Sequence, residues 1–270
     1  MNPMEKHGDA IRRIADEWHR SHRVLFVTGA GISADSGLPT YRGVGGLYDN
    51  EKTEDGIPIE RALSGPMFRM RPEITWKYML EIGRAVLAHR PNGAHQAIAE
   101  LERRAAVRGR EVWTLTQNID GYHTQAGSQN VLEIHGSLRE IFCTQCDWQE
   151  CVDWTDPQKL VELTRTLPPR CPTCTAVIRP NIVLFEEMLP AKVLERFYTL
   201  FDDGNGFDMV IAIGTSAQFP YIISPIMLAS QCGKTTVEIN PLQGELSRHV
   251  TFHLPLRAAE AMKTIMQAIA

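Results

Sequence analysis

Residues 23–37 read Arg23-Val-Leu-Phe-Val-Thr-Gly-Ala-Gly-Ile-Ser-Ala-Asp-Ser-Gly37, and the fold prediction starts from this stretch. A short apolar run that ends in a glycine-rich turn is typical of a buried strand that delivers a loop to a sheet edge. Glycines there let the backbone approach a phosphate, and a following helix offers free amide groups to it. Because Ala34 occupies the third glycine position of the dehydrogenase fingerprint, the turn alone is more often structural than nucleotide-binding.

Similar apolar runs recur along the chain, and helical patterns separate most of them. A helical stripe of Ile11, Ile14, Ala15 and Trp18 precedes the first strand. The further expected strands cover residues 112–116, 131–134, 208–214, 235–240 and 250–254, and the clearest later helices cover 94–106 and 258–269. This alternation predicts an α/β fold with a parallel sheet covered by helices on both faces.

Two segments interrupt the alternation. The segment 43–89 opens with a glycine-rich polar stretch and continues as short helices, and the segment 137–182 contains four cysteines and little helical periodicity. At 270 residues the chain exceeds one domain of about 150 residues. We therefore expect one large domain and a smaller lobe built from both insertions.

Charge and hydropathy exclude two classes of partner. Twenty-eight basic and 32 acidic side chains give a net charge of −4, so nucleic acid is not expected as a direct ligand. The longest apolar runs are far shorter than the roughly 20 residues that span a bilayer. Glu5 and Asp9 stand where a secretory signal has its apolar stretch, so we expect a cytoplasmic protein with no membrane association.

Four of the six cysteines form two C-x-x-C pairs. Cys143 and Cys146 are separated by 24 residues from Cys171 and Cys174. Such pairs typically direct four thiolates at one tetrahedral Zn²⁺, which leaves no open position, so the ion is predicted to be structural. Disulfides or idle thiols are the alternative interpretation.

Polar residues follow two of the later predicted strands. Asn118 and Asp120 come directly after the run that ends at Thr116, and His135 follows the run 131–134. In open parallel sheets, ligands bind outside these strand ends. The alternatives are that Asn118 and Asp120 form a turn and cap a helix, and that His135 is a packed side chain.

Taken together, the motifs resemble the sirtuin family of NAD-dependent protein deacylases, in its bacterial type. The resemblance extends from about residue 20 to residue 260, and the joint order and spacing of the motifs are far more specific than any one of them. The motifs are Gly29-Ala-Gly-Ile-Ser-Ala-Asp-Ser-Gly-Leu-Pro-Thr-Tyr-Arg42, Gln117-Asn-Ile-Asp120, His135-Gly136, the four cysteines, Gly214-Thr-Ser216 and Glu238-Ile-Asn240.

The resemblance implies a fold and a division of the chain. Residues 1–42, 90–136 and 183–270 would form a Rossmann-like NAD-binding domain. Residues 43–89 would supply a cofactor loop and a helical module, and residues 137–182 a zinc-ribbon module. NAD and an acyl-lysine peptide or protein would meet in the cleft between the lobes.

The resemblance also implies the roles of individual residues. His135, Asn118 and Asp120 would be catalytic, with His135 as a general base that acts through the ribose hydroxyls. The acyl group would pass to ADP-ribose as nicotinamide leaves. The residues implied to bind NAD are Gly29, Ala30, Gly31, Asp35, Tyr41, Arg42, Gln117, Asn118, Ile119, Asp120, Gly214, Thr215, Ser216, Asn240 and Ala258. The residues implied to bind the peptide are Val183, Phe185, Glu186 and Glu187.

Two departures from the family bear on the substrate. Glu186 replaces the glycine of the family's F-G-E segment, which suggests a preference for basic residues around the target lysine. Sirtuins that remove succinyl groups carry a Tyr-x-x-Arg pair, whereas this chain has Met79 and Ile82, or Tyr78 and Glu81 if the alignment shifts by one. Neither pair provides a cation, so we predict removal of neutral acyl groups and poor desuccinylation.

Two other functions remain open from the sequence. An NAD glycohydrolase or ADP-ribosyltransferase on the same scaffold would release nicotinamide without an acyl-peptide. A non-catalytic zinc protein that senses NAD or ADP-ribose would not need the base His135.

Overall fold

The computed structural model describes residues 3–38, 53–153, 156–201 and 206–270. Six strands form a parallel sheet in the order β3-β2-β1-β7-β8-β9. These strands are β1 (Arg23–Thr28), β2 (Glu111–Thr116), β3 (Val131–Glu133), β7 (Met209–Ile213), β8 (Thr235–Ile239) and β9 (Phe252–Leu254). Each coincides with an apolar run of the sequence, which confirms the predicted parallel sheet.

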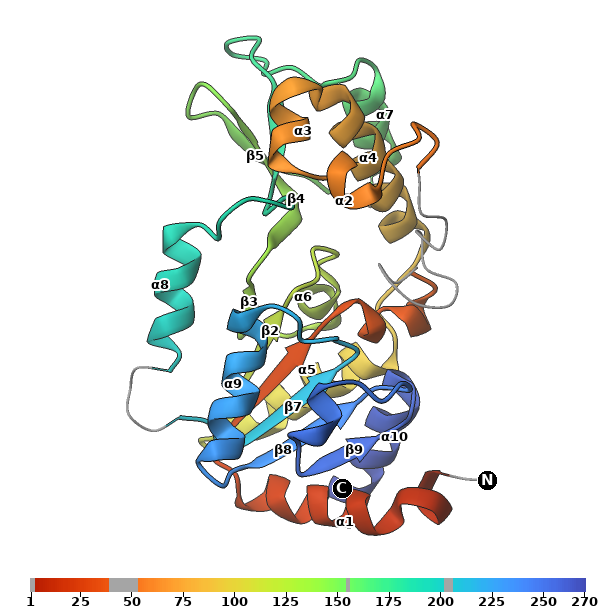
Figure 1. The fold of residues 1–270 in the computed structure, drawn as a ribbon, viewed down its shortest axis with the longest axis vertical. Helices are drawn as coiled ribbons and strands as arrows, with labels where there is room; N and C mark the ends of the chain where they lie inside the picture. The colour runs from red at the N-terminus through yellow and green to blue at the C-terminus, as the bar shows by residue number, and fades with distance from the viewer. Residues whose placement is uncertain (1–2, 39–52, 154–155, 202–205) are drawn as a thin grey trace.

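Helices cover both faces of this sheet, as predicted (Figure 1). Side chains alternate along a strand, so Val24 and Phe26 of β1 join the core under one group of helices, and Leu25 and Val27 join the core under the other. The first group is α1 (Pro3–Arg20), α5 (Gly93–Val107) and α10 (Ala258–Ile269). The second group is α8 (Ala191–Thr199) and α9 (Pro220–Gln231). Burial on both faces explains why these strands are apolar without interruption.

A smaller lobe lies at one end of the molecule (Figure 1). It contains an antiparallel sheet in the order β5-β4-β6. Its elements are α2 (Ile59–Ala62), α3 (Gly65–Met70), α4 (Pro72–Ala88), β4 (Gly136–Cys143), β5 (Gln149–Cys151), α7 (Pro157–Thr164) and β6 (Ile178–Ile182). The short helix α6 (Tyr122–Ala126) follows the loop after β2, and a 3-10 turn, η3, spans Leu246–Arg248.

The two insertions share one hydrophobic core. Trp76 of α4 is buried, and its Nε1 donates a hydrogen bond to the carbonyl oxygen of Ile178 in β6 at 2.8 Å. Leu138 and Ile141 of β4 belong to the same buried cluster as the α4 side chains. The segments therefore pack as a single lobe, while the domain boundaries at 43, 89, 137 and 182 stay predictions.

Two differences from the sequence prediction concern helices. Up to residue 38, where this part of the described chain ends, the helix expected after the first glycine turn is not formed, and two 3-10 turns, η1 (Ala30–Ile32) and η2 (Ala34–Ser36), follow the strand instead. Gly37 ends them in the left-handed region at φ 90°. The helix α7 was not predicted, although Asp156 caps it by accepting from the backbone N–H of Gln158 at 2.8 Å. Among the helices of the described residues, none has both the length and the apolar character that crossing a membrane requires.

Candidate active site and metal centre

The polar segments predicted to bind NAD meet at one edge of the large sheet. Segment 29–31 follows β1, segment 117–120 follows β2, segment 214–216 follows β7, and Asn240 follows β8. Since these strands are parallel and adjacent, their carboxyl ends lie side by side. We refer to this place as the carboxyl edge, which is where open α/β sheets bind ligands.

Glycines let two loops of the carboxyl edge touch. The backbone N–H of Gly31 donates to the carbonyl oxygen of Gly214 at 2.9 Å. A Cβ on Gly31 would lie 2.6 Å from the Cα of Gly214, and a Cβ on Gly29 would lie 2.8 Å from the Gly214 carbonyl oxygen. Gly214 itself has φ +58°, a conformation that favours glycine. The glycine turn is therefore required by packing, whatever it binds.

A hydrogen-bonded group links the β1 and β2 loops. The Asn118 side-chain amide donates to the carbonyl oxygen of Gly29 at 3.2 Å and to Ser33 Oγ at 3.3 Å. Ser33 Oγ donates to Asp120 Oδ2 at 2.7 Å, and the other carboxylate oxygen accepts from the backbone N–H of Tyr122 at 3.0 Å. Burial raises the pKa of Asp120, although both hydrogen bonds act to lower it.

Ser33 and the buried His95 were missed in the sequence analysis. His95 Nδ1 accepts from the backbone N–H of Asn92, so its proton is on Nε2, 3.4 Å from Ser33 Oγ. Burial lowers the pKa of His95 to about 4, so the ring is neutral at pH 7. A chain of donors thus runs from His95 through Ser33 to Asp120. The only sequence signal was the position of Ser33 inside the glycine turn.

Further side chains at the carboxyl edge tie β2, β7 and β8 together. Gln117 Nε2 donates to Thr215 Oγ1 at 2.7 Å, and that hydroxyl also accepts from the backbone N–H of Ala217. The Asn240 amide lies 3.4 Å from the carbonyl oxygen of Thr215. Thr215 is buried and Ser216 is exposed. The edge therefore presents amides, hydroxyls and one carboxylate.

His135 lies at the crossing between the two lobes, because β3 ends at Glu133 and β4 begins at Gly136. Its Nδ1 is 3.1 Å from the carbonyl oxygen of Gln117, and its Nε2 is 2.8 Å from the Tyr221 hydroxyl. Burial lowers the pKa of His135, while the Gln117 carbonyl acts in the opposite direction. The imidazole is therefore neutral near pH 7, as a general base must be.

Two aromatic residues beside His135 were also missed in the sequence analysis. Phe219 and Tyr221 stack on each other with ring centroids 5.4 Å apart and an interplanar angle of 8°. Both rings meet the His135 imidazole edge to face, with centroids 5.7 and 5.8 Å away. They follow the Gly214 turn at the start of α9, where no fingerprint indicated a contact with the histidine.

The structure gives a local role to one predicted NAD residue. The Asp35 carboxylate forms an ion pair with Arg257 at 2.6 Å and accepts from the backbone N–H of Ala259 at 2.9 Å. It therefore stabilises the first turn of α10, which begins at the buried Ala258. Tyr41 and Arg42, with the cofactor loop 43–50, lie outside the described residues.

The predicted peptide segment joins the two lobes through its backbone. The backbone N–H of Val183 donates to the carbonyl oxygen of His135 at 2.8 Å, and that of Phe185 donates to the carbonyl oxygen of Leu63 at 2.9 Å. Glu186 is exposed and has φ +64°, the left-handed conformation in which the family's glycine is favoured. A cavity of about 520 Å³ lies beside Phe185 and Glu186 and is also lined by Glu60 of α2.

Glu187 has a structural partner. Its two carboxylate oxygens accept from Arg179 Nη1 and Nη2, both at 2.9 Å, and one of them also accepts from the backbone N–H of Leu184. Although burial acts to raise it, these hydrogen bonds hold the pKa of Glu187 below its ordinary value. Arg179 in turn lies over the rings of Phe68 and Phe142. The Glu187 carboxylate therefore connects segment 183–187 to Arg179 of β6.

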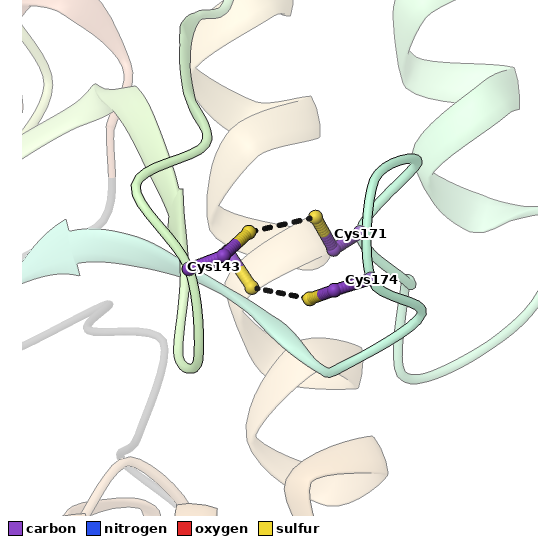
Figure 2. Close-up of side chains that lie close together, drawn as sticks. Cys143, Cys171 and Cys174 are labelled. Carbon is purple, nitrogen blue, oxygen red and sulfur yellow. Dashed lines mark hydrogen bonds between the residues drawn. The ribbon is translucent and has the colours of Figure 1, made fainter.

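Four thiols converge in the small lobe. The Sγ atoms of Cys143 and Cys174 are 3.4 Å apart, those of Cys146 and Cys171 are 3.7 Å apart, and all four lie within 4.8 Å of one another. Figure 2 shows the side chains of Cys143, Cys171 and Cys174 pointing into one small volume. Since a Zn–S bond of about 2.3 Å puts tetrahedral sulfurs about 3.8 Å apart, the thiols fit one Zn²⁺.

Backbone amides prepare the metal site. The N–H groups of Gln145 and Thr173 donate to the sulfurs of Cys143 and Cys171. Burial acts to raise the pKa of Cys171, but the N–H groups of Cys174 and Thr173 lower it to about 6. The convergence of the four sulfurs confirms the predicted Cys₄ metal site as a cluster. Cys151 and Cys232 are exposed and lie outside it.

The acyl-selectivity positions on α4 carry no cation. Met79 and Ile82 are buried in the small-lobe core, and the Tyr78 hydroxyl donates to Asp55 Oδ2 at 2.6 Å. Glu81, on the same helix, is an exposed residue whose pKa is raised by partial desolvation of its carboxyl and by the nearby Glu54. Neither alignment of the Tyr-x-x-Arg pair thus places an arginine here.

Comparisons with known proteins agree with this geometry. The model of the Sir2 family matches residues 29–220. "NAD-dependent protein deacylase 2" of Pseudomonas aeruginosa is 46% identical over 98% of this chain and 99% of that protein. The protein of the same name from Pseudomonas syringae pv. tomato is 49% identical over 94% and 98%.

Solved structures of the same family superpose over almost the whole chain. A structure described as a Sir2 homolog–NAD complex has a TM-score of 0.80 at 33% identity and covers 95% of this chain and 93% of that chain. A Sir2–p53 peptide–NAD⁺ structure has a TM-score of 0.78 at 28% identity and covers 95% and 97%. At such identities and coverage, both the family and the fold are shown.

Proposed function

This chain belongs to the Sir2 family, and we propose that the residues of its carboxyl edge carry out the NAD-dependent removal of acyl groups from lysine side chains. The protein is an NAD-dependent protein deacylase with one structural Cys₄ metal site. The division of the reaction among its residues is our proposal.

The donor set of the carboxyl edge suits NAD as co-substrate. When bound, NAD supplies the glycosidic bond whose cleavage releases nicotinamide and lets ADP-ribose accept the acyl group. Asn118, Asp120 and Ser33 form a connected group of amide, carboxylate and hydroxyl, which can fix a carboxamide and a ribose in one orientation. The β7 loop with Thr215 and Ser216 supplies further hydroxyls for phosphate oxygens, and it packs on Gly31 without a Cβ between them.

His135 is the general base in this proposal, and its hydrogen bonds carry the argument. The Gln117 carbonyl can only accept, so the proton of the neutral ring is on Nδ1 and the lone pair is on Nε2. Burial keeps the ring neutral at pH 7. A neutral imidazole whose fixed tautomer leaves the lone pair on Nε2 can take the proton of a sugar hydroxyl.

The test is mass spectrometry of an acetyl-lysine peptide incubated with NAD and the His135→Ala variant. Loss of a general base predicts a fall in kcat of about 10²- to 10⁴-fold with the fold intact. His19→Ala removes an exposed histidine on α1 and serves as the matched control. Near wild-type turnover by His135→Ala would contradict the assignment, and release of nicotinamide at the same rate without peptide would favour a glycohydrolase.

The substrates are acyl-lysine side chains in proteins or peptides, docked along residues 183–187. An extended peptide can add to this segment by strand pairing, because Glu186 leaves the pairing backbone in place. The exposed carboxylate beside the cavity favours basic residues next to the target lysine. Glu186→Gln keeps the backbone and removes the charge, so kcat/KM for arginine-flanked peptides should fall about twofold to fivefold. An equal fall with neutral peptides would contradict charge selection.

The enzyme is expected to remove neutral acyl groups from lysine. A succinyl group carries a carboxylate, and the buried apolar Met79 and Ile82 give it no counter-charge. Acetyl-lysine should therefore be turned over much faster than succinyl-lysine on one peptide sequence, and comparable rates would contradict this part of the proposal. A reducing, cytoplasmic location is consistent with the free thiols of the metal site.

A further inference from the structure

We propose that Tyr221 is a positioning residue whose hydroxyl occupies the base nitrogen of His135 until the ribose of NAD displaces it. The inference rests on the proposed role of His135 as the general base. The observation behind it is the distance of 2.8 Å between the Tyr221 hydroxyl oxygen and His135 Nε2.

The direction of this hydrogen bond follows from the other side of the ring. The Gln117 carbonyl oxygen, 3.1 Å from His135 Nδ1, has no proton to give, so Nδ1–H is the donor there. In the neutral ring Nε2 is therefore the acceptor, and Tyr221 donates its hydroxyl proton to it. The hydrogen bond from Nδ1–H to the Gln117 carbonyl thus fixes the tautomer that a base acting through Nε2 requires.

The aromatic surroundings hold the hydroxyl in place. Phe219 stacks on the Tyr221 ring at 8°, and His135 meets both rings edge to face. Tyr221 is half-buried with its ring packed at the edge of the core, and Phe219 is exposed, so the phenol has solvent on one side. The Val183 N–H bond to the His135 carbonyl oxygen anchors the histidine backbone from the peptide segment.

The consequence is a competition for one lone pair. A ribose hydroxyl can reach Nε2 only in molecules whose Tyr221 hydroxyl has left this nitrogen. The apparent affinity for NAD therefore equals the intrinsic affinity multiplied by the fraction of molecules in which Nε2 is free. A neutral hydrogen bond of ordinary strength leaves Nε2 free in roughly one molecule in three to one in ten. Once NAD is bound, the hydroxyl is no longer at the nitrogen, so the rate of the bound complex is independent of it.

The test compares the zinc-loaded wild-type chain with Tyr221→Phe, which keeps the ring and removes the hydroxyl. KM for NAD should fall about 3- to 10-fold while kcat is unchanged. In the free protein at pH 8, the ¹⁵N resonance of His135 Nε2 should move downfield as it loses its donor, and Nδ1 should stay protonated. Tyr198→Phe, on the exposed face of α8, is the matched control and should change neither reading.

The outcomes separate the two proposals. An unchanged His135 Nε2 resonance would refute the hydrogen bond from Tyr221, whatever the activity. An unchanged KM for NAD or a lower kcat would refute the competition between the Tyr221 hydroxyl and the ribose. If the resonance moves but His135→Ala retains turnover, the proposed base fails while the hydrogen bond itself stands.

Discussion

Replacing Glu186 by glycine should stabilise this protein. Glu186 has φ +64°, and a non-glycine residue in the left-handed region costs about 1–2 kcal/mol. Its carboxylate has no hydrogen bond or ion pair within the described chain, so removing the side chain loses no such contact. Glycine adds roughly 0.5–1 kcal/mol of backbone entropy to the unfolded state. The difference leaves about 0.5–1 kcal/mol in favour of the variant.

The measurement is equilibrium urea unfolding of zinc-loaded protein, supported by the thermal midpoint. Glu186→Gly should raise the urea midpoint with an unchanged m value and raise Tm by about 1–4 °C. Glu186→Ala keeps the strained backbone and removes the carboxylate, so it should stay near wild type. If glycine lowers the midpoint, or if alanine stabilises equally, backbone strain at this position is not the reason.

Four other predictions concern the Arg179–Glu187 pair, the metal site and His135. Arg179→Met leaves the Glu187 carboxylate without its partner and should lower the unfolding free energy by about 3–5 kcal/mol, which the double variant with Glu187→Met should largely restore. Because the pKa of Glu187 is held below its ordinary value in the folded state, the pair stabilises the protein above about pH 4.5, and its contribution is lost as the pH falls further. If the difference in urea midpoint between the wild type and the double variant is the same at pH 4 and at pH 7, this prediction is wrong. Chelation of the metal, or Cys171→Ser, should abolish zinc binding and unfold the small antiparallel sheet; retained near-wild-type thermal unfolding without zinc would count against a structural metal. Because burial lowers the pKa of His135, the acid limb of kcat/KM should lie below about pH 6.5, with activity present above the limb and lost below it, and a limb above pH 7 would oppose the assignment.

Local patterns predicted much of the fold because they follow from burial. The strands β1 and β7 are buried on both faces, so their sequences are continuously apolar and easily recognised. Paired C-x-x-C spacings likewise predict a metal cluster, since the ligand geometry is short-range. The β5-β4-β6 sheet was not predicted, because β5 is only three residues long and the eight-residue β4 is polar at several positions and runs into the first cysteine turn.

The site was predicted unevenly for a physical reason. Residues that directly follow strands, such as Asn118 and Asp120, are brought together by sheet topology, which the sequence pattern determines. Ser33, His95 and Tyr221 reach the site through side-chain packing between distant elements, and no periodicity encodes such contacts. Asp35 shows the converse: it lies in a motif predicted to bind NAD, but its carboxylate pairs with Arg257 and accepts a hydrogen bond from the backbone of α10.

The strand order of the large sheet has a consequence for synthesis of the protein. β1 lies between β2 and β7, and the Arg23 backbone N–H bonds to Asp208, which lies 185 residues later in the chain. At a ribosomal rate of 5–20 residues per second, one edge of β1 waits roughly 10–40 s for its neighbour. An apolar strand with an unpaired edge is a template for aggregation during that time. The yield of soluble enzyme in cells should therefore depend on chaperone supply more than the stability of the finished fold suggests.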